Sequence, residues 1–193
     1  MITDDNLYPH QRAGSDIDKP VNPSKKCILI YNVRMDMTDS TPVTRALDAL
    51  GIPYVFFRHT GQVASVEQAA AERGMTIDQV VRSIVFRTGP GLFLMVLVGG
   101  TRQVSWPALR RALGQSRLTM ASEEEVLQVT GYRLGAVSPF GLPAPMRILV
   151  DRSAVAPEVI SLGTGIRYTA VVLKSVDLLK ALGDVEPVEL SGE

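Results

Sequence analysis

Cysteine and histidine are scarce in this sequence, which has one cysteine and two histidines among its 193 residues. The lone Cys27 excludes an intrachain disulfide and fits a reducing compartment. His10 and His59 stand far apart, and no His/Cys group has the spacing of zinc ligands. We therefore expect neither a structural nor a catalytic metal.

Long apolar runs and nucleotide-binding motifs are also missing. The longest run, residues 91–98, has the length of a strand, far below the roughly 18 residues of a membrane helix. The first residues lack the charged, apolar and small succession of a secretory signal. The glycines at residues 89–91 and 163–165 lack the Lys-Ser/Thr of a P-loop and match no dinucleotide fingerprint. We expect no membrane partner, no cofactor and a cytoplasmic location.

The ends of the chain differ from its middle in composition. Residues 1–36 open on a polar, aperiodic stretch, and we expect a disordered or extraneous leader with the native start at Met35 or Met37. Residues 184–193 form an acidic tail. Between residues 37 and 183, 15 basic side chains stand against 11 acidic ones. This excess suits either a phosphate-binding face or an ordinary solvated surface.

Residues 37–183 alternate between helix and strand signals. Hydroxyl caps, first-turn prolines and closing glycines predict helices at residues 40–50, 65–71, 105–113, 122–129 and 175–182, the last capped by Ser175. Apolar and β-branched runs predict strands at residues 54–57, 80–87, 92–98, 146–150, 159–162 and 167–173. Strands mixed with helices in one domain indicate an α+β or a mixed-sheet α/β fold.

The loop at residues 131–141 contains three glycines, Pro139 and Ser138. Glycines let main-chain groups approach a ligand closely, and Pro139 stiffens the turn after Ser138. A serine nucleophile would need His59 as its base, but no third orienting group is evident, and Ser138-Pro139 is not the Gly-x-Ser-x-Gly elbow. The ordinary alternatives are a histidine at a strand edge and a serine that bonds its own turn.

The order of these motifs resembles the YbaK/ProX-type aminoacyl-tRNA editing domain, which is also inserted in bacterial prolyl-tRNA synthetases. The resemblance covers residues 40–182, and its most specific part is the loop at residues 130–141. The other matching features are a strand leading to His59, a helix at residues 65–70, a strand opened by Arg82, the pair Gly99-Gly100, a strand closed by Asp151, and the segment 163–179.

The resemblance implies an α+β single domain at residues 37–183, with a mixed, mostly antiparallel, barrel-like central sheet flanked by helices. It implies a trans-acting deacylase that hydrolyses the ester of mischarged tRNA, with the prolyl system and a small alanyl or cysteinyl group expected. The expected partners are the tRNA 3′ end and an aminoacyl-tRNA synthetase. A positioned water and backbone donors for the oxyanion would suffice for this chemistry, without a nucleophile.

The resemblance also assigns candidate site residues. Catalytic roles are expected for Arg82, Gly99, Gly100, Gly135, Ser138 and Asp151. Substrate binding is expected for Arg82, His59, Ala136, Phe140, Gly141 and Gly165.

Two departures from the family pattern leave an alternative open. Arg82 stands where the family usually has lysine, and Ala136 stands where the loop usually has a second glycine. A tRNA- or nucleotide-binding module that has lost hydrolysis is therefore the alternative function. A purely structural protein is more distant, and it predicts a packed Ser138 and no pocket between its loop and the Arg82 strand.

Overall fold

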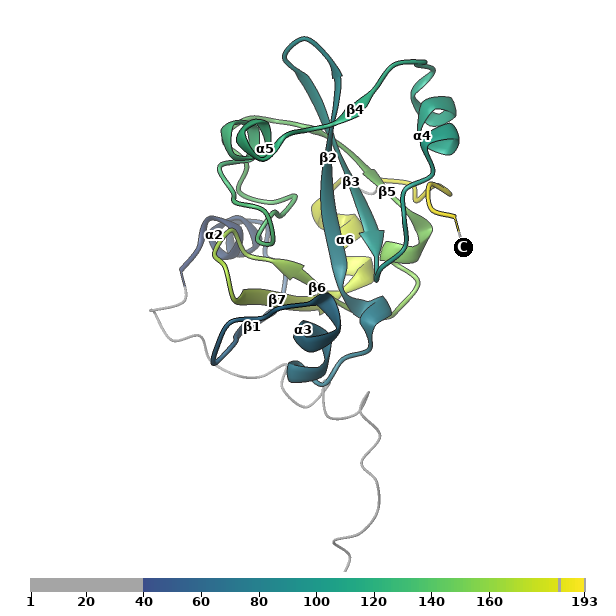
Figure 1. Cartoon of the computed structure of the whole chain (residues 1–193). Helices are drawn as coiled ribbons and strands as arrows, with labels where there is room; N and C mark the ends of the chain where they lie inside the picture. Colours follow the sequence, from purple (N-terminus) through teal and green to yellow (C-terminus); the bar gives the residue numbers. More distant parts are fainter. Residues whose placement is uncertain (1–39, 184, 193) are drawn as a thin grey trace, which may run out of the picture.

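Strands and helices alternate along the part of the chain that the computed structural model describes, residues 40–183 and 185–192 (Figure 1). The expected leader at residues 1–36 lies outside it. The helices are α2 (Pro42–Ala49), α3 (Val66–Glu72), α4 (Trp106–Leu113), α5 (Glu123–Thr130) and α6 (Ser175–Ala181), with 3-10 turns η2 (Ile77–Gln79) and η3 (Arg152–Ala154). The strands are β1 (Val55–Arg58), β2 (Val81–Gly89), β3 (Leu92–Gly99), β4 (Thr119–Met120), β5 (Arg147–Val150), β6 (Val159–Gly163) and β7 (Thr169–Lys174). Within these described residues, no helix has the length and apolarity needed to cross a bilayer.

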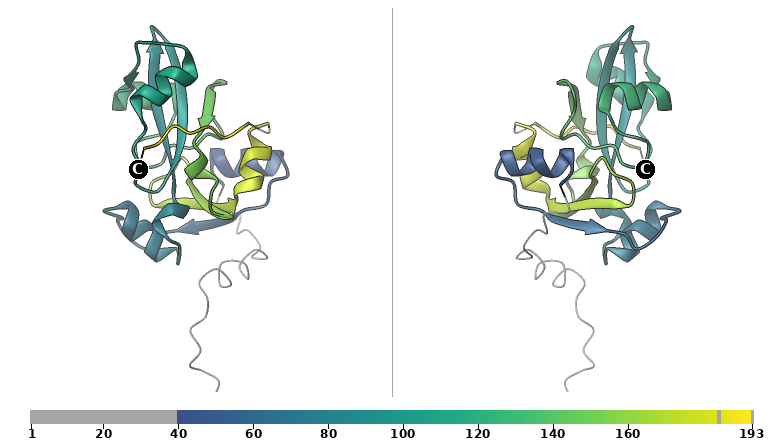
Figure 2. Two further views of the ribbon diagram at one scale, coloured as in Figure 1. Left: turned by 90° about the vertical axis from the view of Figure 1, so that its right-hand side faces the viewer. Right: turned by 90° about the vertical axis from the view of Figure 1, so that its left-hand side faces the viewer.

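The strands form two linked sheets rather than one closed barrel. One sheet has the order β1-β7-β6 and is antiparallel throughout. The other has the order β4-β2-β3-β5, in which β3 and β5 run parallel and the other pairs antiparallel. A parallel bridge between Val80 and Ser161 joins the two sheets, and Figure 2 shows β1 and β7 crossing one end of the β2–β3 hairpin. The predicted mixed, mostly antiparallel α+β architecture is confirmed.

Four of the five helices in the described residues begin directly after a capping hydroxyl. The Thr41, Ser65, Ser105 and Ser122 hydroxyls each accept a hydrogen bond from a first-turn N–H, and Gly114 and Gly131 close their helices in the left-handed conformation. The exception is α6, which Lys174 precedes without a side-chain cap. Ser175, expected to be its cap, is the first helical residue and donates its hydroxyl hydrogen to the Glu158 carbonyl.

The apolar side chains gather in two clusters. The larger lies where the two sheets meet and includes Leu97, Ile160 and Leu173. The smaller packs α4 and Leu118, just before β4, against β2 and β3, and it includes the fully buried Leu190. The segment 185–192 is therefore packed on the domain, although its composition is that of an acidic tail.

Asp151 fixes that segment. Its fully buried carboxylate accepts hydrogen bonds from the N–H groups of Leu190 and Ser191, both at 2.7 Å, from the Ser153 N–H and from the hydroxyls of Ser153 and Ser191. Burial alone would raise the pKa of Asp151, but these donors outweigh it and lower the pKa below its usual value. The carboxylate expected to be catalytic is thus fully engaged within the fold.

Replacing Asp151 with Ala is expected to lower the free energy of unfolding by about 3 kcal/mol, because five donors lose their acceptor. Because the folded pKa is lowered, the Asp151 contribution is present above the unfolded pKa, near pH 4, and is lost as the pH falls through the folded pKa. Urea denaturation from neutral pH to about pH 2 measures both effects. Glu189→Gln, in an exposed carboxylate of the same segment, is the control. Equal stability of Asp151→Ala and wild type at neutral pH contradicts the prediction.

Candidate functional site

A cavity of about 540 Å³ opens beside the bridge that joins the two sheets. Its walls come from α3 and the turn before it, the start of β2, residues 134–137 of the glycine loop, and β6, β7 and their connecting turn. The cavity thus lies between the glycine loop and the strand of Arg82, where a purely structural protein was expected to have none. This observation counts against the structural alternative.

The lining of the cavity is apolar with a basic excess. Valines, alanines and leucines form much of its wall. The basic lining side chains are His59, Arg73, Arg82 and Arg167, and no aspartate or glutamate of the described residues lines it. The electrostatic potential in such a space favours a ligand that carries negative charge or strong acceptor atoms.

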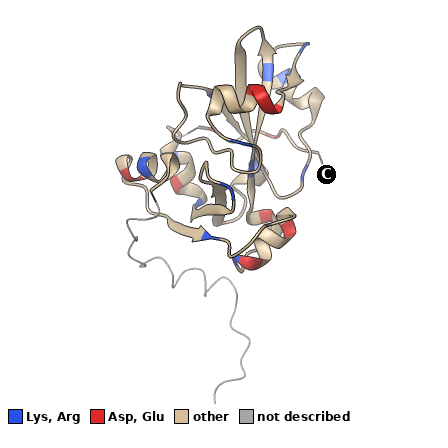
Figure 3. Ribbon diagram, turned by 60° about the vertical axis from the view of Figure 1, so that its left-hand side comes forward, with Lys and Arg blue, Asp and Glu red and all other residues tan. Residues whose placement is uncertain are grey.

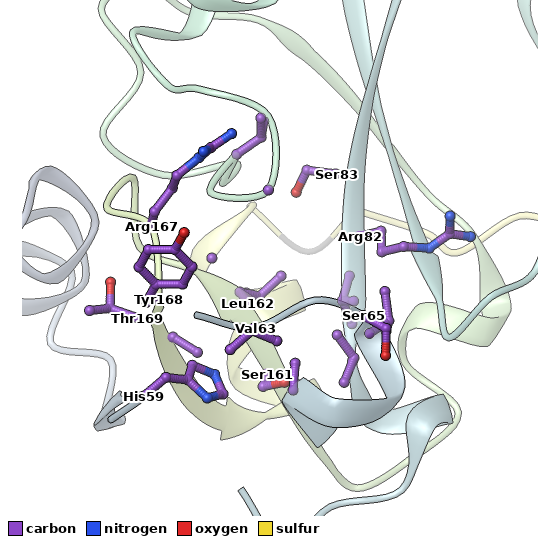
Figure 4. A pocket seen from close by; sticks show the side chains of 18 of the residues that line it. His59, Val63, Ser65, Arg82, Ser83, Ser161, Leu162, Arg167, Tyr168 and Thr169 are labelled. Carbon is purple, nitrogen blue, oxygen red and sulfur yellow. The ribbon is translucent and has the colours of Figure 1, made fainter. Parts of the chain in front are cut away.

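Ser83 lies at one end of the cavity. It follows Arg82 on β2 and shares the inward face of the strand with Val81 and Val85. Its Oγ is buried and has no hydrogen-bond partner among the described residues, and Figure 4 shows the hydroxyl directed from β2 toward the space opposite Arg167. Because an unmet buried hydroxyl costs about 1–3 kcal/mol, Ser83 is a natural contact for a ligand.

A chain of polar side chains lies at the other end of the cavity. The Glu72 carboxylate contacts His59 Nδ1 at 2.5 Å, Arg73 Nε contacts His59 Nε2 at 3.4 Å, and Arg73 Nη1 contacts Ser161 Oγ at 2.5 Å. Burial lowers the pKa of Arg73 to about 10, although Glu72 opposes the shift, so the guanidinium is charged at neutral pH. Hydrogen bonds from His59 and Gln68 lower the pKa of Glu72.

Arg167 and Tyr168 form the rim between these two ends (Figure 4). Tyr168 has φ +63°, a left-handed conformation that a tyrosine rarely adopts, and its carbonyl accepts the His59 N–H at 2.8 Å. The Tyr168 residue is 38% exposed. Arg167 donates to the Leu134 carbonyl at 3.5 Å, so the rim reaches the glycine loop.

The Arg82 guanidinium is directed away from the other labelled side chains (Figure 4). Its Nε donates to the Gly100 carbonyl at 2.6 Å, and its Nη2 donates to the Arg102 carbonyl. Burial lowers the pKa of Arg82. The stem of Arg82 therefore lines the cavity while its head holds the turn after β3.

The glycine loop folds around Tyr132, not around Ser138. The Tyr132 hydroxyl donates to the carbonyls of Phe140 and Gly141, at 2.8 and 2.9 Å. Ser138 is fully buried, and its Oγ has one contact among the described residues, the Phe140 N–H at 3.5 Å. Ser138 therefore bonds within its own turn, as the ordinary alternative expected, and its burial is the one feature that the structural alternative also predicted.

The predicted site residues divide into two groups. His59, Arg82 and Gly135 line the cavity. The others do not line it, and they are Gly99, Gly100, Ala136, Ser138, Phe140, Gly141, Asp151 and Gly165. The Gly99 N–H donates a hydrogen bond to the Ser153 hydroxyl at 3.0 Å, and that hydroxyl in turn donates to the Asp151 carboxylate. The Ala136 carbonyl accepts the Gly165 N–H at 2.9 Å, which ties the loop to the β6–β7 turn.

Sequence reasoning missed Arg73, Ser83, Ser161, Arg167 and Tyr168. For Ser83 a signal exists, because a polar residue between two inward-facing valines interrupts the apolar face of a strand. Arg73 and Ser161 lie 88 positions apart, and no local pattern connects them.

A family model for the aminoacyl-tRNA editing domain matches residues 60–181. This chain belongs to that family. The proline–tRNA ligase of Thermosipho africanus is 37% identical over 93 residues, which cover 48% of this chain and 16% of the ligase. That of Thermosipho melanesiensis is 34% identical over 94 residues, which cover 49% of this chain and 16% of the ligase. Uncharacterized protein YwhH of Bacillus subtilis is 29% identical over 115 residues, 60% of this chain and 73% of that protein. The chain thus matches about one sixth of each ligase.

Solved structures share the fold of this editing domain. A candidate trans-editing enzyme for prolyl-tRNA synthetase aligns with a TM-score of 0.68 and 22% identity, over 90% of this chain and all of that one (100%). The hypothetical protein APE2540 aligns with a TM-score of 0.72 and 22% identity, over 78% of this chain and 99% of the other. At this identity the likeness shows the fold alone.

Two glycines of the editing domain give a matched test of how its cavity wall is packed. Gly135 and Gly165 both have φ +85°, but a Cβ at Gly135 would meet no atom within 4 Å, whereas one at Gly165 would lie 2.4 Å from the Tyr132 ring. Gly135→Ala is expected to cost about 1 kcal/mol from backbone strain alone, and Gly165→Ala at least about 2 kcal/mol more. Urea denaturation measures the difference. Equal losses of unfolding free energy for the two variants would contradict the prediction, because they would show that the Tyr132 ring moves aside without an energetic cost.

Proposed function

We propose that this protein hydrolyses the ester bond of mischarged tRNA in trans, in the prolyl system, and removes a small aminoacyl group such as alanyl or cysteinyl. The cavity is the observation that carries the proposal. Its volume of about 540 Å³ suits a nucleoside joined to a small acyl group, and its charged lining residues are all basic. Mischarged tRNA supplies such a group next to phosphates, and the cytoplasm is the proposed site of action.

The rim offers two contacts for the tRNA 3′ end. The half-exposed Tyr168 ring can stack a terminal base, a contact worth about 1–3 kcal/mol. Arg167 reaches over the same rim with donors to spare beyond its bond to Leu134, and a guanidinium matches a phosphate bidentately. Arg82 Nη1 makes no hydrogen bond to the main chain of the described residues, which leaves it a donor for the terminal nucleotide.

The chemistry proposed for the ester is attack by water. The N–H groups of Gly135 and Val137 donate to no other described residue, and both residues line the cavity, so they are candidate donors for the oxyanion. Three serines line the cavity, and Ser65 caps α3. Ser83 and Ser161 have no base beside them, because Ser83 Oγ is unpartnered within the described chain and the Ser161 partner, Arg73, only donates. A positioned water is therefore favoured over a serine nucleophile.

An aminoacyl-tRNA synthetase is the proposed macromolecular partner besides tRNA. The matching proline–tRNA ligases carry the corresponding region within their own chains. A separate chain would meet the same substrate after release or during handover. Discrimination of small side chains by cavity size is worth only about 1–3 kcal/mol, which is why a second hydrolytic step improves fidelity.

A binding module without turnover is the second candidate function. The observation that favours it is the orientation of the Arg82 guanidinium. Its Nε and Nη2 donate hydrogen bonds to the carbonyls of Gly100 and Arg102 instead of pointing into the cavity. Ala136, whose side chain is buried behind the cavity wall, is the second departure from the family pattern.

We expect the wild-type protein to deacylate alanyl-, cysteinyl- or seryl-tRNA of the prolyl system faster than prolyl-tRNA. Ser83→Val, which fills the cavity at its unpartnered hydroxyl, is expected to lower the rate at least about tenfold, and Arg82→Ala by a similar factor through weaker binding of the 3′ end. Ser138→Ala is expected to change the rate less than Ser83→Val, because its side chain does not line the cavity. Release of labelled amino acid measures each rate.

Ser116→Ala, in an exposed serine far along the chain from the cavity residues, is the control for the serine variants. If folded wild-type protein hydrolyses none of the charged tRNAs, the deacylase proposal is wrong. Tight tRNA binding in that case would favour the binding module.

A further inference from the structure

The polar chain formed by Glu72, His59, Arg73 and Ser161 has a fixed direction. Arginine carries five N–H groups and no acceptor, so Arg73 Nε donates to His59 Nε2, which must hold a lone pair. The His59 proton then sits on Nδ1 and is donated to Glu72. At the other end, Ser161 Oγ accepts from Arg73 Nη1. Each bond in the chain thus orients the next.

This direction leaves the Ser161 hydroxyl hydrogen unused. No described residue accepts a hydrogen bond from it, and Ser161 lines the cavity. Figure 4 shows Ser161 and His59 at the same end of the cavity, opposite Ser83. Figure 4 shows the apolar side chains of Val63 and Leu162 between Ser161 and the rest of the cavity lining.

Arg73 is an energetically costly residue at this position, because burial disfavours its charged form. Its guanidinium is largely buried and forms no ion pair with a carboxylate of the described residues, although the charge of the neighbouring Glu72, whose carboxylate contacts His59, favours the charged form of Arg73. A buried charge without such a partner is destabilising by several kcal/mol before its hydrogen bonds are counted. A structural role alone would be met by an apolar side chain of similar size, so the charge points to a ligand.

We propose that Ser161, positioned by Arg73 and the Glu72–His59 pair, is a specificity-determining residue that donates a hydrogen bond to an oxygen or nitrogen acceptor of the ligand. This inference rests on the proposed function in that the ligand is the aminoacylated 3′ end of tRNA. The acceptor belongs either to a hydroxyl on the aminoacyl side chain or to the terminal adenosine. A site built around such a donor discriminates against a ligand without the acceptor, because the buried donor is then left unmet.

The test compares Ser161→Ala with wild type on seryl- and alanyl-tRNA of the prolyl system. We expect Ser161→Ala to raise KM or lower kcat/KM about tenfold or more on at least one substrate. A loss confined to the seryl substrate assigns the acceptor to the side-chain hydroxyl, and an equal loss on both assigns it to the adenosine. A change below about twofold on both substrates, with the variant folded, overturns the proposal.

The positioning role of Arg73 is tested by a double-mutant cycle. If Arg73 acts through Ser161, Arg73→Gln lowers kcat/KM in the wild-type background but adds little in the Ser161→Ala background. Arg73→Lys, which keeps the charge and one donor, should recover part of the loss. Additive losses in the two backgrounds would assign Arg73 a general structural role and overturn this step.

A binding measurement separates this inference from the deacylase proposal. Calorimetry with 3′-seryl and 3′-alanyl amide analogues of adenosine, which the enzyme cannot hydrolyse as esters, compares wild type, Ser161→Ala and Ser116→Ala. Weaker binding by Ser161→Ala alone supports the inference even if wild type hydrolyses no charged tRNA. Equal binding by all three proteins overturns it, even if wild type is an active deacylase.

Discussion

The bridge between Val80 and Ser161 is the contact on which the rest of the site depends. At this bridge the chain that enters β2 runs parallel to β6. Because strands twist, β2 and β6 diverge beyond the bridge. The wedge between them is the cavity, with Ser161 at its narrow end and Ser83 further along β2. Gly100, whose N–H donates to the Val80 carbonyl at 2.8 Å, holds the same point from the side of β3.

Local features of the fold could be predicted because they depend on residues within a few positions of one another. The caps at Thr41 and Ser122 and the β2–β3 hairpin are of this kind. The parallel pairing of β3 with β5 and the separation into two sheets follow from contacts between distant segments, and single-sequence patterns do not carry that information.

The candidate site was predictable in part for the same reason. The loop, Arg82 and His59 were found from motif order, and the cavity adjoins all three. The hydrogen bond between Arg73 and Ser161 joins residues 88 positions apart, and no periodic pattern in the sequence predicts such a contact. Asp151 shows the opposite case, since a carboxylate at a strand end suggests chemistry, yet five internal donors saturate it.

The glycine loop contributes shape more than side-chain chemistry. Burial raises the pKa of Tyr132, although Arg45 opposes the shift, and so favours the neutral hydroxyl that donates to the loop carbonyls. The loop is therefore braced from inside, and its outer residues can present main-chain groups to the cavity without collapsing into it. Rigid backbone donors of this kind need no reorganisation when charge develops on a ligand.

The Asp151 clamp also bears on how the chain folds as it is made. Ser191, one of the hydrogen-bond donors to Asp151, lies 40 positions downstream. During synthesis the Asp151 carboxylate therefore lacks this donor until the segment around Ser191 has emerged from the ribosome. Until then the Gly99 turn, which Ser153 supports from Asp151, lacks part of its scaffold. The Gly99 turn and the Asp151 clamp can thus reach their final form only after the segment around residue 191 has docked.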